Sequence, residues 1–504
     1  MWKTDVLIII MVKTKRDDSY SHILKYTGLF GGVQGLGIVV GLVRNKLVAM
    51  ILGPDGMGLI SLFNSTIKLV SDSTNFGIGM SAVKNISAEY DSGDCHRIRH
   101  SIKLIRSWSL LAAILGMFVC IVLSPLLNKW TFTWGDHTLH FVLLSPVVGL
   151  MAITAGEMAI LKGTRQLRHL ASISIYNVVG VLVTSVPIYY FFGEAGIVPS
   201  LVIGALIQML LTIGYSYRMF KPQLSFSKPL LGEGMGMVRL GVAFVVAGIL
   251  GSGAEFLIRS FLNTNGSLEI VGLYNAGYMM TITYAGMVFS AMETDYFPRL
   301  SSIRGTGKEM NRVVNNQIEV SLLMVSPLLV AFMISQPILL PLLYTGKFLP
   351  AMGMIQITIL SMYLRAVKLP IAYIPLARGD SRSYLLMEGI YDVALVLVLM
   401  ACFREWGLTG AGIAITAAAV FDFVMLCLYM RWKYGYCLSR RAVRYCMMQL
   451  PLGILAFLVT FVHQPFLYWL MGTLLFVVSL MISINVFKSK THLMETLRNK
   501  FSHR

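Results

Sequence analysis

The stretch Gly41–Gly58, GLVRNKLVAMILGPDGMG, joins an apolar run to a tight turn of glycine and proline. The apolar run extends back to about residue 24, which is long enough for a helix to cross a hydrocarbon core of roughly 30 Å. Two cations, Arg44 and Lys46, lie inside it, where each charge costs about 2.5–3.5 kcal/mol even on lenient scales. The stretch therefore predicts a transmembrane helix whose charges need an explanation.

The composition indicates that the whole chain is a membrane protein. Its 504 residues are 56% hydrophobic and 13% charged, whereas soluble domains carry about 25% charged residues. Apolar runs of about 20 residues recur along the chain without the alternation typical of an outer-membrane barrel. The six cysteines are scattered and form no CxxC pair, so we expect reduced thiols, no metal site and no cofactor. We predict an all-α integral membrane protein.

Glycine, proline and charge breaks divide the apolar runs into about fourteen predicted transmembrane helices. Their approximate spans are 24–51, 57–83, 104–127, 138–161, 170–192, 196–217, 240–262, 270–294, 318–343, 352–377, 384–403, 408–430, 446–463 and 466–487. The predicted parts are a segment 1–23, an N-lobe 24–217, a linker 218–239, a C-lobe 240–433, two further helices in 446–487 and a basic tail 488–504. Two pseudo-symmetric six-helix lobes around a central cavity are an architecture of secondary transporters.

The basic residues predict how this arrangement is oriented. With the N-terminus in the cytoplasm, the external loops hold only Lys129, Lys347 and Arg404. The other loop cations, Arg106 among them, fall inside, as the positive-inside rule requires. We expect both termini in the cytoplasm, and we attribute most of the net charge of +18 to topology rather than to binding of nucleic acid. Met1 and Met11 both stay open as the start.

Six cations remain inside the predicted spans: Arg44, Lys46, Lys68, Arg259, Arg365 and Lys368. Such a residue is by default a functional candidate, but each also has a structural interpretation. Lys68 is too deep for its amine to reach the interface easily, yet Asp72 one turn on could neutralise it. Arg259 could extend outward or pair with Glu255 at i−4.

The other four cations also have both a functional and a structural interpretation. Arg365 and Lys368 lie one turn apart before two prolines, and a kinked helix often borders a water-filled cavity, although Lys368 could also extend inward. Arg44 and Lys46 point about 200° apart on a regular helix, so both can face one cavity only if the helix is bent. The acids in these spans are Asp72, Glu157, Glu255, Glu293, Asp295, Glu319, Glu388, Asp392 and Asp422. We assign none of them as a coupling site.

The chemistry of these cations favours an anionic substrate. Arginine binds phosphate in a bidentate manner and lysine binds it as a point charge. Both contacts strengthen in a partly dehydrated cavity. An exporter of cationic drugs would need a cavity lined by acids instead.

Five segments resemble the polysaccharide-transporter branch of the MOP (multidrug/oligosaccharidyl-lipid/polysaccharide) exporter superfamily. They are ILGPDGMGLISLF (51–63), FGIGMSAVKNISAEY (76–90), ILKGTRQ (160–166), VGLYNAGYMMT to YFPRLSSI (271–303) and LYTGKFLPA (343–351). They occur in the family's order over residues 24–433. The chain is similar to Wzx-type flippases for O-antigen or enterobacterial common antigen, which have twelve helices.

This resemblance implies a function. Such flippases move undecaprenyl-diphosphate-linked oligosaccharide to the periplasmic leaflet of the inner membrane by alternating access, and their cavity is basic. By position in the family pattern, Lys46, Lys84 and Arg259 fall where related flippases tend to carry cations. The implied partners are this substrate, membrane lipids, glycan polymerase or chain-length proteins, and a coupling proton or sodium ion.

Three alternatives stay open. A fourteen-helix count also resembles the lipid II flippases of peptidoglycan synthesis, in which the extra pair forms a groove for the lipid tail. A cation-coupled multidrug antiporter is disfavoured because the first helix carries Arg44 and Lys46 but no acid. An O-antigen polymerase or ligase would place catalytic groups in a long external loop, whereas the predicted external loops are short, so we predict that the protein is not an enzyme.

Overall fold

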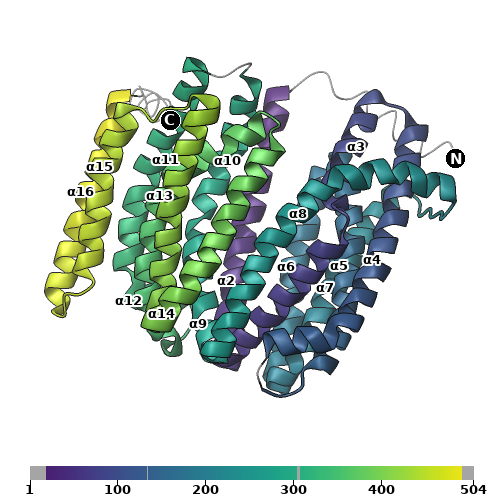
Figure 1. Cartoon of the computed structure of the whole chain (residues 1–504), viewed down its shortest axis with the longest axis horizontal. Coiled ribbons are helices and arrows are strands. Elements are labelled where there is room, and N and C mark those ends of the chain that lie inside the picture. Colours follow the sequence, from purple (N-terminus) through teal and green to yellow (C-terminus); the bar gives the residue numbers. More distant parts are fainter. Residues whose placement is uncertain (1–18, 133, 304–306, 491–504) are drawn as a thin grey trace, which may run out of the picture. The chain divides into compact units, whose positions relative to one another are not determined.

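The computed structural model describes residues 19–132, 134–303 and 307–490, and these residues form helices joined by short connections (Figure 1). Ten helical stretches among them are long and apolar enough to cross a membrane. Three of the ten, of 40, 52 and 54 residues, are far longer than the roughly 20 residues that one crossing requires. The all-α membrane fold is confirmed, and the count of fourteen spans stays a prediction. The predicted segment 1–23 and tail 488–504 lie largely outside the described residues.

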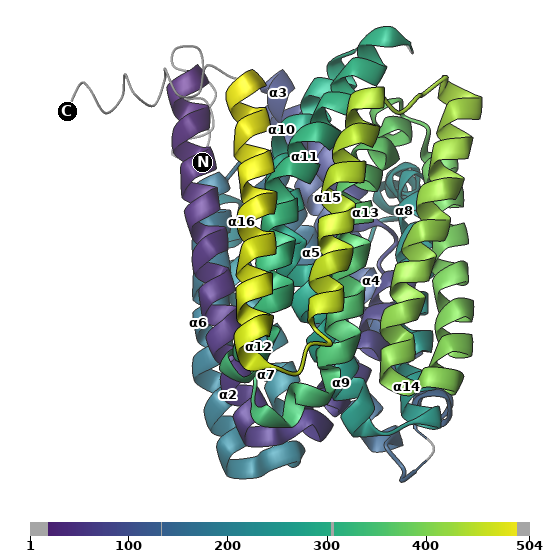
Figure 2. The ribbon, with the colours of Figure 1, turned by 90° about the vertical axis from the view of Figure 1, so that its left-hand side faces the viewer.

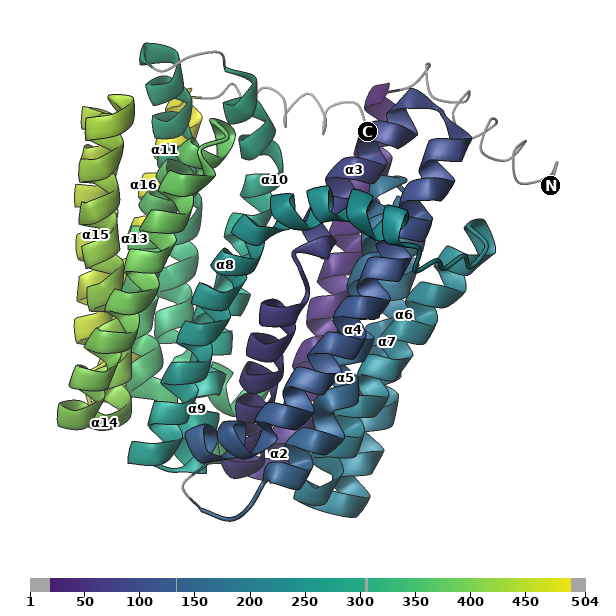
Figure 3. The same cartoon turned by 45° about the vertical axis from the view of Figure 1, so that its right-hand side comes forward.

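The chain divides into two compact units. Unit 1 comprises the described residues up to Gly272 together with Leu343–Thr345. Its helices are α2 (Ser19–Thr74), α3 (Ile78–Ser92), α4 (Cys95–Thr131), α5 (Thr138–Gly163), α6 (Leu167–Phe192), η1 (Gly193–Gly196), α7 (Ile197–Met219) and α8 (Lys228–Asn265). Figure 3 shows α4, α5, α6 and α7 running side by side. The division assigns α8 to unit 1, whereas the predicted lobe boundary precedes it; the lobes themselves stay a prediction.

Unit 2 comprises Leu273–Leu342 and the described residues from Gly346 onward. Its helices are the end of α9 (Leu268–Tyr278), η2 (Met279–Ala285), α10 (Met287–Ser302), α11 (Lys308–Ile334), α12 (Gln336–Leu343), η3 (Gly346–Ala351), α13 (Met352–Ala377), α14 (Ser381–Tyr434), α15 (Arg440–Val459) and α16 (Pro465–Lys490). The predicted helix 270–294 is therefore not one regular helix, because the π-helical segment η2 interrupts it.

The first predicted turn is a sharp break within α2. Gly53 has φ 67° and ψ −169°, which is outside the helical region, and Pro54 follows. Glycine reaches a positive φ without the steric cost that a Cβ imposes, and proline lacks the N–H that a continuing helix would use. The glycine and proline of the opening motif thus separate two helical parts. Gly407, with φ 55°, divides α14 in the same way.

The predicted helix 57–83 is wrong at its end, because the chain leaves the helix at Thr74 and starts α3 at Ile78. Phe76 and Gly77 both have positive φ, and the Asn75 side chain accepts a hydrogen bond from the Gly77 N–H at 2.8 Å. A Cβ placed on Gly77 would lie 2.4 Å from the carbonyl oxygen of Gly241 on α8. The break is therefore where two backbones cross with no side chain between them.

The predicted linker 218–239 is non-helical only from Phe220 to Ser227, because α7 ends at Met219 and α8 already begins at Lys228. Pro229 lies in the first turn of α8, where its fixed φ suits a helix and its missing N–H costs nothing. Figure 3 shows that α8 changes direction along its length. The earlier part of α8 is glycine-rich and less apolar, so hydropathy alone placed the helix start twelve residues too late.

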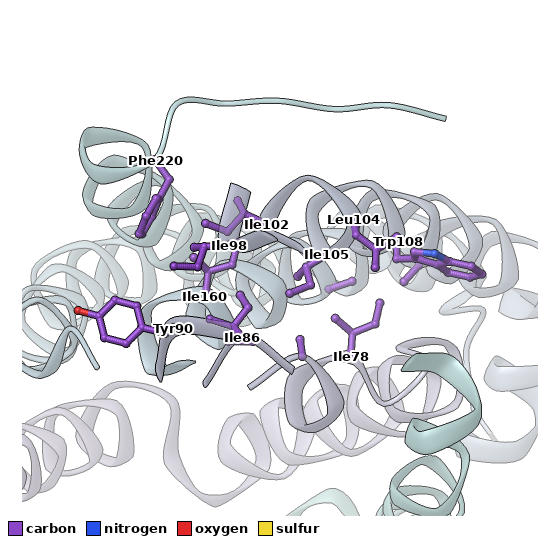
Figure 4. Close-up of a cluster of buried hydrophobic side chains, with 14 of the residues drawn as sticks. Ile78, Ile86, Tyr90, Ile98, Ile102, Leu104, Ile105, Trp108, Ile160 and Phe220 are labelled. Carbon is purple, nitrogen blue, oxygen red and sulfur yellow. The ribbon is translucent and has the colours of Figure 1, made fainter. Parts of the chain in front are cut away.

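A cluster of apolar side chains joins α3, α4 and α5 (Figure 4). Ile86, Ile105 and Ile160 are almost fully buried in it, and Phe220, directly after α7, adds its ring. Each fully buried aliphatic side chain stabilises the fold by about 1.5–3 kcal/mol. This packing fixes the ends of three helices and the start of the connection to α8.

The two C-terminal helices pack against α11 in unit 2 (Figure 2). Buried polar groups join them: Gln449 donates to the Ser483 hydroxyl at 3.0 Å and accepts from the Ser479 hydroxyl at 2.7 Å. Tyr468 donates to the carbonyl of Ile334 at 2.8 Å, which ties α16 to the end of α11. Satisfied polar groups of this kind stabilise helix pairs in lipid.

Asp380 connects the two ends of α14 in unit 2 through hydrogen bonds. Its side chain caps α14 and accepts hydrogen bonds from Lys433 and Tyr434, both at 2.6 Å, and from Ser383 at 2.7 Å. These donors, Lys433 foremost, hold the pKa of Asp380 well below its usual range. A carboxyl group whose pKa is lowered by folding stabilises the fold at any pH above its ordinary pKa of about 4. This contribution is lost only as the pH falls below that value. The contact therefore persists at physiological pH.

The crossing at Gly77 gives a stability prediction. Gly77→Ala should lower the free energy of unfolding by about 2 kcal/mol or more, because it forces a Cβ into a positive φ and against the α8 backbone. Thermal unfolding of the purified protein in detergent measures the change. Gly79→Ala is the control, since its Cβ would meet only Ala155 at 4.0 Å and should be neutral or slightly stabilising. Equal melting temperatures for the two variants would contradict the crossing.

Candidate functional site

A bridged ion pair links α2 to α8 in unit 1. The Lys68 Nζ donates to Glu255 Oε1 at 2.9 Å, and Arg259 Nη1 lies 3.4 Å from Glu255 Oε2. Arg259 Nε also donates to the Ser61 hydroxyl at 2.8 Å, which orients the guanidinium. Two of the predicted site cations are thus brought together on one carboxylate.

The exposure of this bridge distinguishes it from the enclosed ion pair of Arg106 with Glu157. The side chains of Lys68 and Glu255 are 47% and 32% exposed, and that of Arg259 is 10% exposed. Lys68 lies fifteen residues after Gly53, or roughly 20 Å along the helix. Charges at such depth are costly in hydrocarbon but are tolerated where they face water. The exposed carboxylate and ammonium of this bridge are therefore accessible from outside unit 1.

The interpretation of Lys68 as an i,i+4 pair with Asp72 is incomplete. The ion pair of Lys68 is formed across helices with Glu255, while Asp72 interacts with Lys68 only electrostatically at longer range. The interpretation of Arg259 as a partner of Glu255 at i−4 is confirmed by their ion pair.

Arg44 and Lys46 contact different parts of unit 1. Arg44 Nε donates to the Ser185 hydroxyl on α6 at 3.2 Å, and the Lys46 ammonium donates to the backbone carbonyl of Tyr344. Both side chains are half-buried. These separate partners are consistent with the 200° between the two side chains on a helix. Lys84 lies on α3, where it is exposed.

Arg365 and Lys368 lie on α13 in unit 2 with unlike surroundings. Arg365 Nη1 donates to the carbonyl of Ile282 in η2 at 3.3 Å, and its guanidinium lies 5.8 Å from the centre of the Phe289 ring. Lys368 forms an ion pair with the buried Asp422. Arg365 thus contacts a π-helical segment, a feature that is frequent at functional sites.

Lys368 is further enclosed by α14. Its ammonium lies 4.4 Å from the centre of the Tyr391 ring, and Glu388 is near enough to interact with both Lys368 and Asp422. A cation over an aromatic face is stabilised by the ring quadrupole. Each unit therefore holds cations on membrane helices: Lys68 in unit 1 is exposed, whereas Lys368 in unit 2 is mostly enclosed.

Sequence reasoning missed a buried ion pair. Arg106, which the loop assignment placed in the cytoplasm, lies inside unit 1 with its Nε 2.7 Å from Glu157 Oε1, and both side chains are 3% exposed. Its other donors contact the Ser216 hydroxyl and the carbonyls of Phe220 and Lys221. Arg106 thus joins α4, α5 and the end of α7. A usable signal was that Arg106 and Glu157 lie at similar depth on antiparallel neighbours.

A comparison with known proteins identifies the family of the chain. The family model described as "Polysaccharide biosynthesis protein" matches residues 47–353, which is more than half of the chain. The chain belongs to this polysaccharide biosynthesis protein family.

One relative and one solved structure of similar fold are flippases by name. The Lipid III flippase of Escherichia coli (strain K12) is 22% identical over 411 residues, covering 79% of this chain and 95% of that protein. The solved structure titled "Lipid II flippase MurJ, inward closed conformation" has a TM-score of 0.68 at 14% identity and covers 92% of this chain and 99% of that one.

A third likeness concerns the fold. An inward-facing multidrug resistance MATE family transporter of the MOP superfamily has a TM-score of 0.61 at 15% identity, covering 79% of this chain and 94% of that one. At these identities the solved structures establish the fold only. This family member therefore has the fold of MOP exporters, which confirms the predicted fold class and resemblance.

The enclosed Arg106 gives a second stability prediction for this family member. Arg106→Ala should lower the free energy of unfolding by about 3–5 kcal/mol, because it leaves Glu157 charged, buried and without its guanidinium. Protein level and thermal unfolding measure the loss. Arg97→Ala is the control: the pair of Arg97 with Asp94 is 73% and 43% exposed, so its loss should cost less than about 1 kcal/mol. A small effect at both positions would mean that Arg106 is solvated.

Proposed function

We propose that the protein is a flippase that moves an undecaprenyl-diphosphate-linked oligosaccharide of O-antigen type from the cytoplasmic to the periplasmic leaflet by alternating access. The bridge between α2 and α8, with its exposed Lys68 and its buried Arg259, carries this proposal. Lys68 and Arg259 present an ammonium and a guanidinium within 3.4 Å of one carboxylate. This is donor chemistry that also binds phosphate oxygens.

The location of these donors supports a lipid-linked substrate. They lie on membrane helices, so a ligand bound there could keep an apolar tail in the bilayer while its diphosphate meets the cations. Arg365 and Lys368 in unit 2 are the further candidates for the anionic part, and Arg44, Lys46 and Lys84 complete the candidate set. The relative named Lipid III flippase supports the same class of substrate.

The proposal includes the cellular setting. The protein is multi-pass, and we place it in the inner membrane with both termini in the cytoplasm, where lipid-linked precursors are made. It acts as a transporter without a catalytic centre. The coupling ion is a proton or sodium, and a glycan polymerase or chain-length protein would receive the product.

Removal of single cations tests the proposal in cells. Lys68→Ala and Arg365→Ala should each abolish surface glycan while the protein level stays unchanged, because the substrate's charge loses a contact that the bilayer cannot replace. Immunoblots of glycan and of the tagged protein measure both quantities. Lys129→Ala, an exposed cation at the end of α4, is the control and should export normally. Normal glycan in both test variants would refute the assignment.

Deletion of the gene separates the alternatives. Loss of surface polysaccharide in a viable cell is expected for the proposed substrate. Lethality that a known lipid II flippase relieves would indicate a peptidoglycan precursor instead, and hypersensitivity to cationic drugs would indicate a multidrug antiporter.

A further inference from the structure

We infer that Glu255 is an internal competitor of the substrate: its carboxylate occupies the anion position formed by Lys68 and Arg259, and the substrate must displace it to bind. This inference rests on the proposed function and concerns how the substrate binds to the same site and leaves it. It assigns Glu255 a role in positioning and release.

The geometry of the bridge is that of an occupied anion site. Glu255 uses both carboxylate oxygens, Oε1 toward Lys68 at 2.9 Å and Oε2 toward Arg259 at 3.4 Å. A phosphate offers the same arrangement of negatively charged acceptor oxygens with more charge. Ser61 orients the Arg259 guanidinium through Nε, and Nη1 donates to the backbone carbonyl of Glu255 at 3.2 Å as well as to its carboxylate at 3.4 Å.

Accessibility distinguishes this bridge from two other ion pairs of the membrane helices, Arg106–Glu157 and Lys368–Asp422. The Arg106–Glu157 pair is enclosed and its guanidinium is saturated by further acceptors, as a structural contact requires. Lys368 pairs with Asp422, which is almost fully buried. Glu255 instead is one-third exposed, and its partner Lys68 is nearly half exposed. Arg259 is only 10% exposed, so an external anion reaches this bridge from the side of Lys68 and Glu255, where it can exchange with the carboxylate.

An exchangeable carboxylate lowers the cost of placing two positive charges in a membrane protein. Two cations without a counterion would be costly when the site is empty, and with no competitor they would hold a multivalent anion tightly. Glu255 neutralises part of this charge in the empty state. Its return to Lys68 and Arg259 then favours departure of the bound anion.

Binding measurements test this exchange. The probes are farnesyl diphosphate and inorganic pyrophosphate, titrated by calorimetry into the full-length protein in detergent. Glu255→Gln should bind farnesyl diphosphate roughly tenfold more tightly than the wild type, since tenfold corresponds to one lost competing contact. Glu255→Asp should also bind more tightly, because its shorter side chain keeps the charge but cannot bridge both cations.

The variants separate displacement from a general change of charge. Asp72→Asn removes an acid that interacts with Lys68 and Glu255 from one turn away without bridging the cations. If only the local potential matters, Asp72→Asn should match Glu255→Gln and Glu255→Asp should behave as the wild type. That pattern, or wild-type affinity in all three variants, would overturn the inference. Tightening with both probes identifies the diphosphate as the ligand, and tightening with farnesyl diphosphate alone identifies a lipid-linked one.

Export in cells completes the test. Glu255→Gln should reduce surface glycan at normal protein level even though it binds the probe more tightly, because release becomes slow. A purely structural role would lower thermal stability instead. If the wild type binds neither probe and Lys68→Ala exports normally, the proposed function itself fails. If the wild type binds and Lys68→Ala weakens binding, but the Glu255 variants equal the wild type, only the exchange fails.

Discussion

The cost of an ion in hydrocarbon is the constraint on which the placement of every charged side chain here depends. The protein meets it in two ways. Arg106 and Glu157 are enclosed together and their remaining hydrogen-bonding groups are satisfied by neighbouring helices. Lys68, Glu255 and Arg259 share charge on an exposed face, which is tolerable only beside water. The enclosed pair of Arg106 and Glu157 holds helices together, whereas the exposed bridge leaves charge available to a ligand.

Helix boundaries could be predicted well wherever hydropathy and local sequence determine them. The span 352–377 coincides with α13, and the break at Gly53 follows from a glycine and proline motif. The break at Asn75–Gly77 could not be foreseen, because Gly77 is required by the backbone of Gly241, which is distant in sequence. The start of α8 was missed because its first twelve residues are not an apolar run.

The residue types of the candidate site were predictable, but their partners were not. An intramembrane cation can be recognised from its position alone, whereas its counterion depends on which helices pack together. Lys68 has an acid one turn away, yet its ion pair is with Glu255, 187 residues later. Arg106 was misassigned because charge statistics describe loops and do not detect a cation that a neighbouring helix neutralises. Placement of Arg365 and Lys368 relative to unit 1 remains a prediction of the lobe model.

The π-helical segment η2 affects how the helix that follows it is oriented. A π-helix has more residues per turn than an α-helix, so each residue in it turns the chain through a smaller angle. Over the seven residues of η2 the accumulated difference is on the order of 100°, about one residue of an α-helix. A helical wheel drawn continuously from α9 into α10 would therefore assign the wrong side of α10 to its neighbours. The hydrophobic periodicity of this region can therefore be interpreted only when separate helical wheels are drawn for α9 and α10.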